Sequence, residues 1–196
     1  MAMNPTVSNY VSIQLPLGGH SFSQKDITKC AAEGVVAEVV VSTIKSVAVP
    51  EPLFNAAAMV DYLAMAHLAV AKNEVAVAAE PKDGIVVVMA VNAECDALLQ
   101  KSYPQGVVYR SPLTMGELPE EGSVLHLAEG VLYIRVVKQG LQLAEAVEVN
   151  GEADILYVLE QIHHLYDIYN MCARVQGANK QLMGACKKVF KNLVCE

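Results

Sequence analysis

The chain has 196 residues, of which 54% are hydrophobic and only 18% are charged, and its formal net charge is −7. This length allows one compact domain or two small ones, and the apolar content is enough for a sizeable core, which excludes a disordered chain. The negative charge and the lack of a basic patch in the sequence exclude a nucleic-acid-binding surface.

Targeting and membrane signals are also missing from the sequence. The opening residues, MAMNPTVSNY, contain no basic region followed by an apolar stretch, so we expect no signal peptide. The longest apolar segment, residues 56–71, is interrupted by Asp61 and His67 and is shorter than the roughly 18 residues of a membrane span. Five cysteines without a CxxC motif indicate reduced thiols. These features predict a cytoplasmic protein without a membrane span.

The first part of the chain alternates expected strands with two expected helices. Residues 10–15 and 20–23 are extended around Pro16-Leu17-Gly18-Gly19, which predicts an opening hairpin. Apolar residues at helical spacing after two prolines predict a helix over residues 53–70, and Asn92 is placed to cap a second helix. The other expected strands are residues 35–44, 75–77, 85–91 and 107–109.

The segment 111–123 is rich in proline and turn residues, and it is the best candidate for a connector. In the strand predicted after it, Leu132, Ile134 and Val136 share one face, while Tyr133 and Arg135 share the other. The elements expected beyond the connector are strands at 124–127, 131–137, 141–149, 169–175 and 193–195, and helices from 152 or 154 to 166 and over 180–191. The pattern predicts an α/β (α+β) fold with halves at residues 1–110 and 124–196.

The segment VLHLAEGVLYIRVV, residues 124–137, predicts a strand, a short turn and a second strand. This arrangement resembles the start of the second half of actin-like ATPases, the superfamily of sugar kinases, the Hsp70 nucleotide domain and the pilus-assembly and cell-division actins. In that superfamily an aspartate follows the first strand, and a glycine-rich turn with a threonine comes next. Here His126 stands in place of the aspartate, Ala128-Glu129-Gly130 in place of the glycines, and Val131 in place of the threonine.

The other two motifs of the superfamily are also altered. At the first phosphate loop Gln14 takes the acidic position and Pro16 takes a glycine position, although Gly18 follows. The third motif resembles residues 171–182, where only Gly177 of a glycine pair remains, beside Gln176 and Ala178. The resemblance implies two ribonuclease H-like halves in a compact actin-like ATPase fold without large insertions. It also implies a vestigial nucleotide cleft at Gln14, Gly18, His126, Glu129, Gly130, Gln176 and Gly177.

The whole chain is also similar to an uncharacterised bacterial family with a degenerate actin-like fold. The similarity lies in the segments VSIQLPLGGHSFS, VAVPEPLF and ILYVLEQI. That family has no established activity, so this resemblance implies a fold rather than a reaction.

The altered positions remove the chemistry that holds nucleotide. Magnesium prefers hard oxygen ligands, which Gln14 and His126 supply poorly, and phosphate loops need glycine backbone close to the anion. The carboxylate of Glu129 would repel phosphate by roughly 4 kcal/mol at a separation of about 4 Å and an effective dielectric near 20. We therefore expect no ATP hydrolysis and no bound cofactor.

Three functions remain open from the sequence. The favoured one is a catalytically inactive actin-like domain that acts as a binding or scaffold protein for a protein partner or for a second copy of itself. The alternative is a nucleotide-binding protein or kinase with atypical phosphate loops. The third is a metal-dependent hydrolase that uses Glu160, His163 and His164, which lie within one helical turn.

Overall fold

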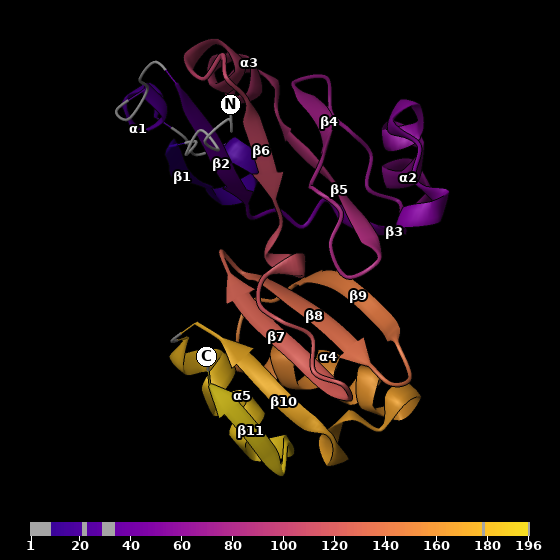
Figure 1. The fold of residues 1–196 in the computed structure, drawn as a ribbon. Coiled ribbons are helices and arrows are strands. Elements are labelled where there is room, and N and C mark those ends of the chain that lie inside the picture. The colour runs from indigo at the N-terminus through magenta and orange to yellow at the C-terminus, as the bar shows by residue number, and fades with distance from the viewer. Residues whose placement is uncertain (1–8, 21–22, 29–33, 178, 196) are drawn as a thin grey trace, which may run out of the picture.

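The computed structural model describes residues 9–20, 23–28, 34–177 and 179–195, and it places their strands in three sheets. Figure 1 shows two of these sheets in the upper part of the molecule and the third in the lower part. The residues that make up the upper part are those before the connector, and the residues after it form the lower part.

The upper part contains one parallel and one antiparallel sheet. The parallel sheet has the order β1-β2-β6, and the antiparallel sheet has the order β3-β5-β4. Their bounds are β1 Asn9–Leu15, β2 Val35–Val41, β3 Ser46–Pro50, β4 Glu74–Ala78, β5 Ile85–Asn92 and β6 Val107–Arg110. Strand β5 lies in the middle of the antiparallel sheet, and it is buried from Ile85 to Val91, because its residues are apolar on both faces.

The helices of the upper part are α1 Gln24–Thr28, α2 Met59–Met65 and α3 Ala93–Ser102. The Oδ1 atom of Asn92 accepts a hydrogen bond of 3.0 Å from the backbone N–H of Cys95, which confirms the predicted cap of α3. Leu63 of α2 packs on Val88 and Ala90 of β5 in a small core of its own. Among the described residues, no helix has both the length and the apolar character needed to cross a membrane.

Two of the predicted elements in this part are wrong. Strand β1 pairs in parallel with β2, so the described residues do not form the predicted opening hairpin, and the backbone turns instead through Pro16–Gly19. Part of the predicted second hairpin strand, residues 21 and 22, lies outside the described residues. The helix expected over 53–70 is an α-helix only in α2, because short 3₁₀ turns precede it and His67 has a left-handed backbone.

The lower part is a five-stranded sheet with the order β11-β10-β7-β8-β9. An antiparallel meander of β7, β8 and β9 is followed by β10, parallel to β7, and by β11, parallel to β10, which is the ribonuclease H-like arrangement. The strand bounds are β7 Gly122–Ala128, β8 Val131–Val137, β9 Leu141–Glu148, β10 Cys172–Gln176 and β11 Asn192–Cys195. The helices are α4 Glu152–Tyr166 and α5 Lys180–Val189.

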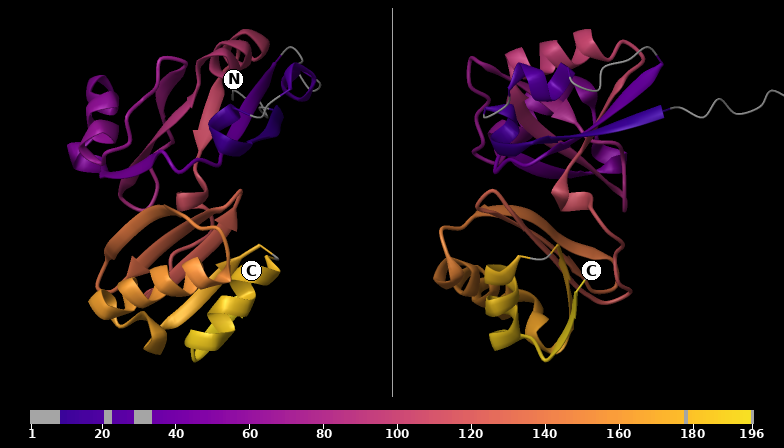
Figure 2. Two further views of the ribbon diagram at one scale, coloured as in Figure 1. Left: turned by 180° about the vertical axis from the view of Figure 1, so that it is seen from behind. Right: turned by 90° about the vertical axis from the view of Figure 1, so that its left-hand side faces the viewer.

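The two faces of β8 pack against different partners. Leu132, Ile134 and Val136 belong to the core between the sheet and the helices α4 and α5. Figure 2 shows these two helices on the side of the sheet away from the upper part. Tyr133 lies on the opposite face, in the core of the upper part. The lower sheet is therefore buried on both faces in the middle, and both β8 and β9 pack against the upper part.

Candidate functional site

A cavity of about 310 Å³ lies between the two parts of the molecule, where the superfamily resemblance implies a nucleotide cleft. Five short segments form its walls: the turn after β1, the link between β2 and β3, the start of β4, the β7–β8 turn and the end of β9. The residues that line this inter-part cleft are Leu17, His20, Thr43, Ile44, Lys45, Glu74, Glu129, Gly130, Val131, Glu148 and Asn150.

The β7–β8 turn supplies the lower wall of the cleft. Glu129 and Gly130 both have left-handed backbones, with φ of 51° and 74°, as a tight two-residue hairpin turn requires. The carbonyl oxygen of Gly130 accepts a hydrogen bond of 2.8 Å from the N–H of Val149, which fixes the turn against the end of β9. The turn geometry survives here, and an exposed carboxylate occupies it.

Gly18 lies under the upper wall of the cleft and cannot serve a phosphate. Its N–H donates a hydrogen bond of 2.9 Å to the carbonyl oxygen of Ser42. A Cβ atom at this position would lie 2.9 Å from the carbonyl oxygen of Ala90, and the backbone φ is +63°. Packing of the turn onto β5 therefore requires glycine here, while the N–H group that an anion would need already has a partner.

His126, Gln176 and Gly177 form a separate cluster at the end of the β7–β10 pair. Nδ1 of His126 lies 3.1 Å from the carbonyl oxygen of Gln176, its partner in the strand register. The side chain of Gln176 lies against Gly116, where an added Cβ atom would be 1.4 Å from its Nε2. Gln14, by contrast, is exposed on β1 and does not line the cleft. Of the seven residues predicted from the sequence, only Glu129 and Gly130 line it.

The cleft also holds an ionic group that the sequence did not reveal. The Glu74 side chain is only 6% exposed, and it lies 2.6 Å from Lys45 Nζ and 3.0 Å from His20 Nε2. It also accepts a hydrogen bond of 2.8 Å from the N–H of Ala71. Lys45 and His20 are 29 and 54 positions away in the chain, so no local spacing could have indicated this group.

The charge of Glu74 is stabilised by its partners. Burial alone would raise the pKa of its carboxyl group, but the hydrogen bonds from Lys45, Ala71 and His20 outweigh burial and hold the pKa below its usual range. A depressed pKa means that the folded state favours the ionised group. The resulting stabilisation is complete above the ordinary pKa near 4.5 and is lost as the pH falls through the folded-state value.

We expect Glu74→Gln to lower the free energy of unfolding by about 2 kcal/mol at pH 7, since hydrogen bonds to a charged group are lost. Urea denaturation at several pH values checks this, and the difference from the unsubstituted protein should shrink as the pH falls below about 4. Glu38→Gln is the matched control, because Glu38 pairs with Arg110 at the surface and should lose less than about 1 kcal/mol. A pH-independent loss would contradict the assignment.

The described residues of the cleft offer the phosphates of a nucleotide no free cation, because Lys45 and His20 are both paired with Glu74. Three carboxylates line the cleft, those of Glu74, Glu129 and Glu148, and Lys45 is already paired with Glu74. An anion placed there meets carboxylates on both walls, and the Gly18 N–H that could bind it is occupied. Among the described residues, no group of three or more His, Cys, Asp and Glu side chains could hold a metal ion.

The residues of the hydrolase hypothesis have other partners. The ring of His163 stacks on Tyr169 at a centroid distance of 3.9 Å, and Nε2 of His164 lies 3.4 Å from Glu160. The hydroxyl group of Tyr169 donates a hydrogen bond of 2.9 Å to Glu160. These contacts indicate a structural cluster at the end of α4.

No protein-family model and no curated protein matches the sequence. Among solved structures, a Bacteroides thetaiotaomicron protein with an actin-like ATPase fold and unknown function superposes with a TM-score of 0.75 at 15% identity, covering 96% of this chain and 91% of that chain. The cytoplasmic domain of EpsL, an inner-membrane component of the type II secretion system of Vibrio cholerae, gives a TM-score of 0.46 at 10% identity, covering 95% and 85%. The first similarity confirms the predicted actin-like ATPase fold, and at this identity it establishes the fold alone.

Proposed function

We propose that this chain is a catalytically inactive binding protein of the actin-like ATPase fold, whose surfaces engage a protein partner. The observation that carries the proposal is the set of three carboxylates that line the inter-part cleft, Glu74, Glu129 and Glu148. A site that binds ATP must attract phosphate, and this one repels it. The fold is then retained as a scaffold and not as a catalyst.

Exposed apolar side chains support a binding role. Leu53, Val60 and Met65, in and just before α2, are all exposed, and we take this region as a candidate contact surface for a protein partner. The proposal includes the division at residues 1–110, 111–123 and 124–196, and a cytoplasmic location. The location is supported by Cys95, Cys172, Cys186 and Cys195, which are all free thiols.

Calorimetry with ATP and Mg²⁺ tests the loss of nucleotide binding. We expect no saturable heat at concentrations up to about 1 mM, which corresponds to a binding free energy weaker than about −4 kcal/mol. The physical reason is the repulsion between phosphate and the cleft carboxylates. A clear micromolar isotherm would contradict the proposal and would favour the alternative, a nucleotide-binding protein with atypical phosphate loops.

A charge-neutralised variant shows whether repulsion is the cause. Glu129→Gln with Glu148→Gln removes two carboxylates from one wall of the cleft, and we expect weak phosphate-dependent binding to appear. The matched control is Glu117→Gln with Glu121→Gln, which removes the same charge from exposed positions that do not line the cleft. Equal gains in both variants would show that net charge, and not the cleft, limits binding.

A further inference from the structure

Strand β9 forms an open edge of the lower sheet. It is last in the order β11-β10-β7-β8-β9, and among the described residues it pairs with β8 alone. Every residue of β8 is buried, whereas from Leu141 to Glu148 no residue of β9 is. The outer side of such a strand presents backbone N–H and C=O groups that can pair with another chain.

Strand β9 lacks several of the features that usually protect an edge strand, although Glu145 and Glu148 place two charges on it. Its sequence, LQLAEAVE, contains no proline, glycine or lysine, whereas β3 ends in Pro50 and β11 has only four residues. A register shift affects the start of β9, but the segment from Leu143 to Glu148 stays in continuous register with β8. That segment is long enough to act as a template for one more strand.

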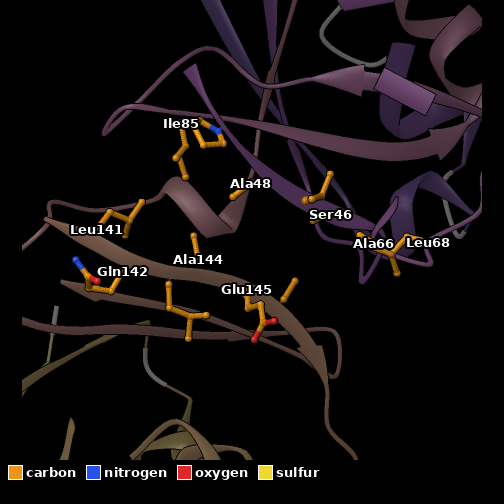
Figure 3. Close-up of a pocket in the computed structure, with 13 residues that line it drawn as sticks. Ser46, Ala48, Ala66, Leu68, Ile85, Leu141, Gln142, Ala144 and Glu145 are labelled. Atoms are coloured by element: carbon orange, nitrogen blue, oxygen red, sulfur yellow. The ribbon is translucent and has the colours of Figure 1, made fainter. Parts of the chain in front are cut away.

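A hollow of about 440 Å³ runs beside this edge, between β9 and β3. Figure 3 shows Ala144 of β9 and Ala48 of β3 at this hollow, with Ala66 and Leu68 at its far end. The hollow exists because alanines line both sides, so their short side chains leave space unfilled. It has room for a large apolar side chain carried by a strand that pairs with β9.

The charge beside the edge selects the kind of partner. The exposed side chains of β9 are Gln142, Glu145 and Glu148, and Glu145 is the one charged group among the residues that line the hollow. A second copy of the chain, with its net charge of −7, would bring further carboxylates to this edge. A basic segment would instead place opposite charges across the new strand pair.

We propose that β9 binds an extended, basic segment of a partner protein as an additional strand, with one apolar side chain of that segment in the alanine-lined hollow. Main-chain hydrogen bonds to the edge supply affinity, while the hollow and Glu145 supply specificity. This inference rests on the proposed function and deepens it by naming the surface and the chemistry of the partner.

Two synthetic peptides test the proposal, each as long as β9, one alternating lysine with valine and the other alternating glutamate with valine. Fluorescence anisotropy should show binding of the basic peptide and at least roughly tenfold weaker binding of the acidic one. Amide hydrogen exchange should slow along β9 when the basic peptide is added. The opposite edge, β11, is the internal control and should not change.

Two substitutions locate the binding surface. Glu145→Lys reverses the charge beside the hollow and should weaken binding of the basic peptide by about fivefold, whereas the matched Glu117→Lys should change it less than about twofold. Ala144→Phe fills the hollow and should abolish binding. If Ala144→Phe does not fold, Glu145→Lys alone tests the surface, because Glu145 is exposed and its substitution should leave the fold intact.

Three results would overturn the proposal: no binding of the basic peptide, protection at an edge other than β9, or a dimer by light scattering whose β9 amides are protected before peptide is added. The last result would assign the edge to a second copy of the chain. The ATP titration tests the proposed function separately. A protein that binds neither ATP nor the basic peptide would refute this binding surface and leave the proposed function standing.

Discussion

Asp83→Asn is expected to lower the free energy of unfolding by about 3 kcal/mol, because it leaves a buried cation without its counter-charge. The Arg135 side chain on β8 is only 2% exposed, and its Nη1 lies 2.8 Å from Oδ2 of Asp83, in the turn before β5. Burial lowers the pKa of Arg135, and Asp83 acts against that shift. The Asp83→Asn substitution therefore removes the charge that stabilises the buried guanidinium group of Arg135.

Asparagine is the right replacement at this position because only the charge changes. Asp83 has a left-handed backbone, with φ of 56°, and asparagine tolerates that conformation about as well as aspartate. The Asp83 side chain is 20% exposed, so some water remains near the pair. We therefore expect a loss at the lower end of the range for a broken buried ion pair.

Urea denaturation measures the loss, and two further variants interpret it. Lys188→Gln breaks a largely exposed ion pair, in which Lys188 Nζ lies 2.6 Å from Glu152. This variant should lower the free energy of unfolding by less than about 1 kcal/mol. Asp83→Asn combined with Arg135→Met removes the unpaired cation and should recover part of the stability. A loss below about 1 kcal/mol for Asp83→Asn alone would show that water replaces the carboxylate.

The pair matters for the fold because it joins the two parts of the molecule. The Asp83 turn belongs to the upper part, and β8 belongs to the lower sheet. In the same turn, Nζ of Lys82 donates a hydrogen bond of 2.8 Å to the carbonyl oxygen of Gly116 in the connector. Arg135 also donates to the carbonyl oxygen of Met115. This joint is one of the contacts that hold the two parts together, beside the packing of Tyr133 on the upper core.

The alternation in β8 was predictable, but the environment of one of its faces was not. Leu132, Ile134 and Val136 do share a face, and Tyr133 and Arg135 share the other. An arginine on a strand normally indicates a solvated face. Its burial depends on a carboxylate 52 positions earlier in the chain, which no pattern within β8 can indicate.

Features that depend on neighbouring residues were predictable from the sequence, and features that depend on residues far apart in the chain were not. The turn at Glu129 and Gly130 was predictable because turn chemistry is local. The opening hairpin was wrong because a turn signal such as Pro16–Gly19 does not determine which strand β1 pairs with. The group of Glu74, Lys45 and His20 forms only when strands distant in the chain come together, so the sequence could not reveal it.

Tyr133→Ala is expected to lower the free energy of unfolding by about 4 kcal/mol, the size of effect seen when a large buried aromatic side chain is truncated. Tyr133 is 2% exposed and projects from the lower sheet into the core of the upper part. Its hydroxyl group donates a hydrogen bond of 3.3 Å to the carbonyl oxygen of Thr43, beside the inter-part cleft. Burial raises the pKa of Tyr133, so the hydroxyl keeps its proton at neutral pH.

Tyr133→Phe separates packing from hydrogen bonding, since it keeps the ring and removes only the hydroxyl group. We expect it to lose about 1 kcal/mol, and Tyr157→Ala on the outside of α4, where the side chain is 67% exposed, to lose less than about 0.5 kcal/mol. Calorimetry also shows whether the two parts of the molecule unfold together. The lower part keeps its own core around Leu132 and Ile134, so we expect one unfolding transition for the unsubstituted protein and two for Tyr133→Ala, as the parts uncouple. A single transition with a loss below about 1.5 kcal/mol would show that the two parts are held together elsewhere.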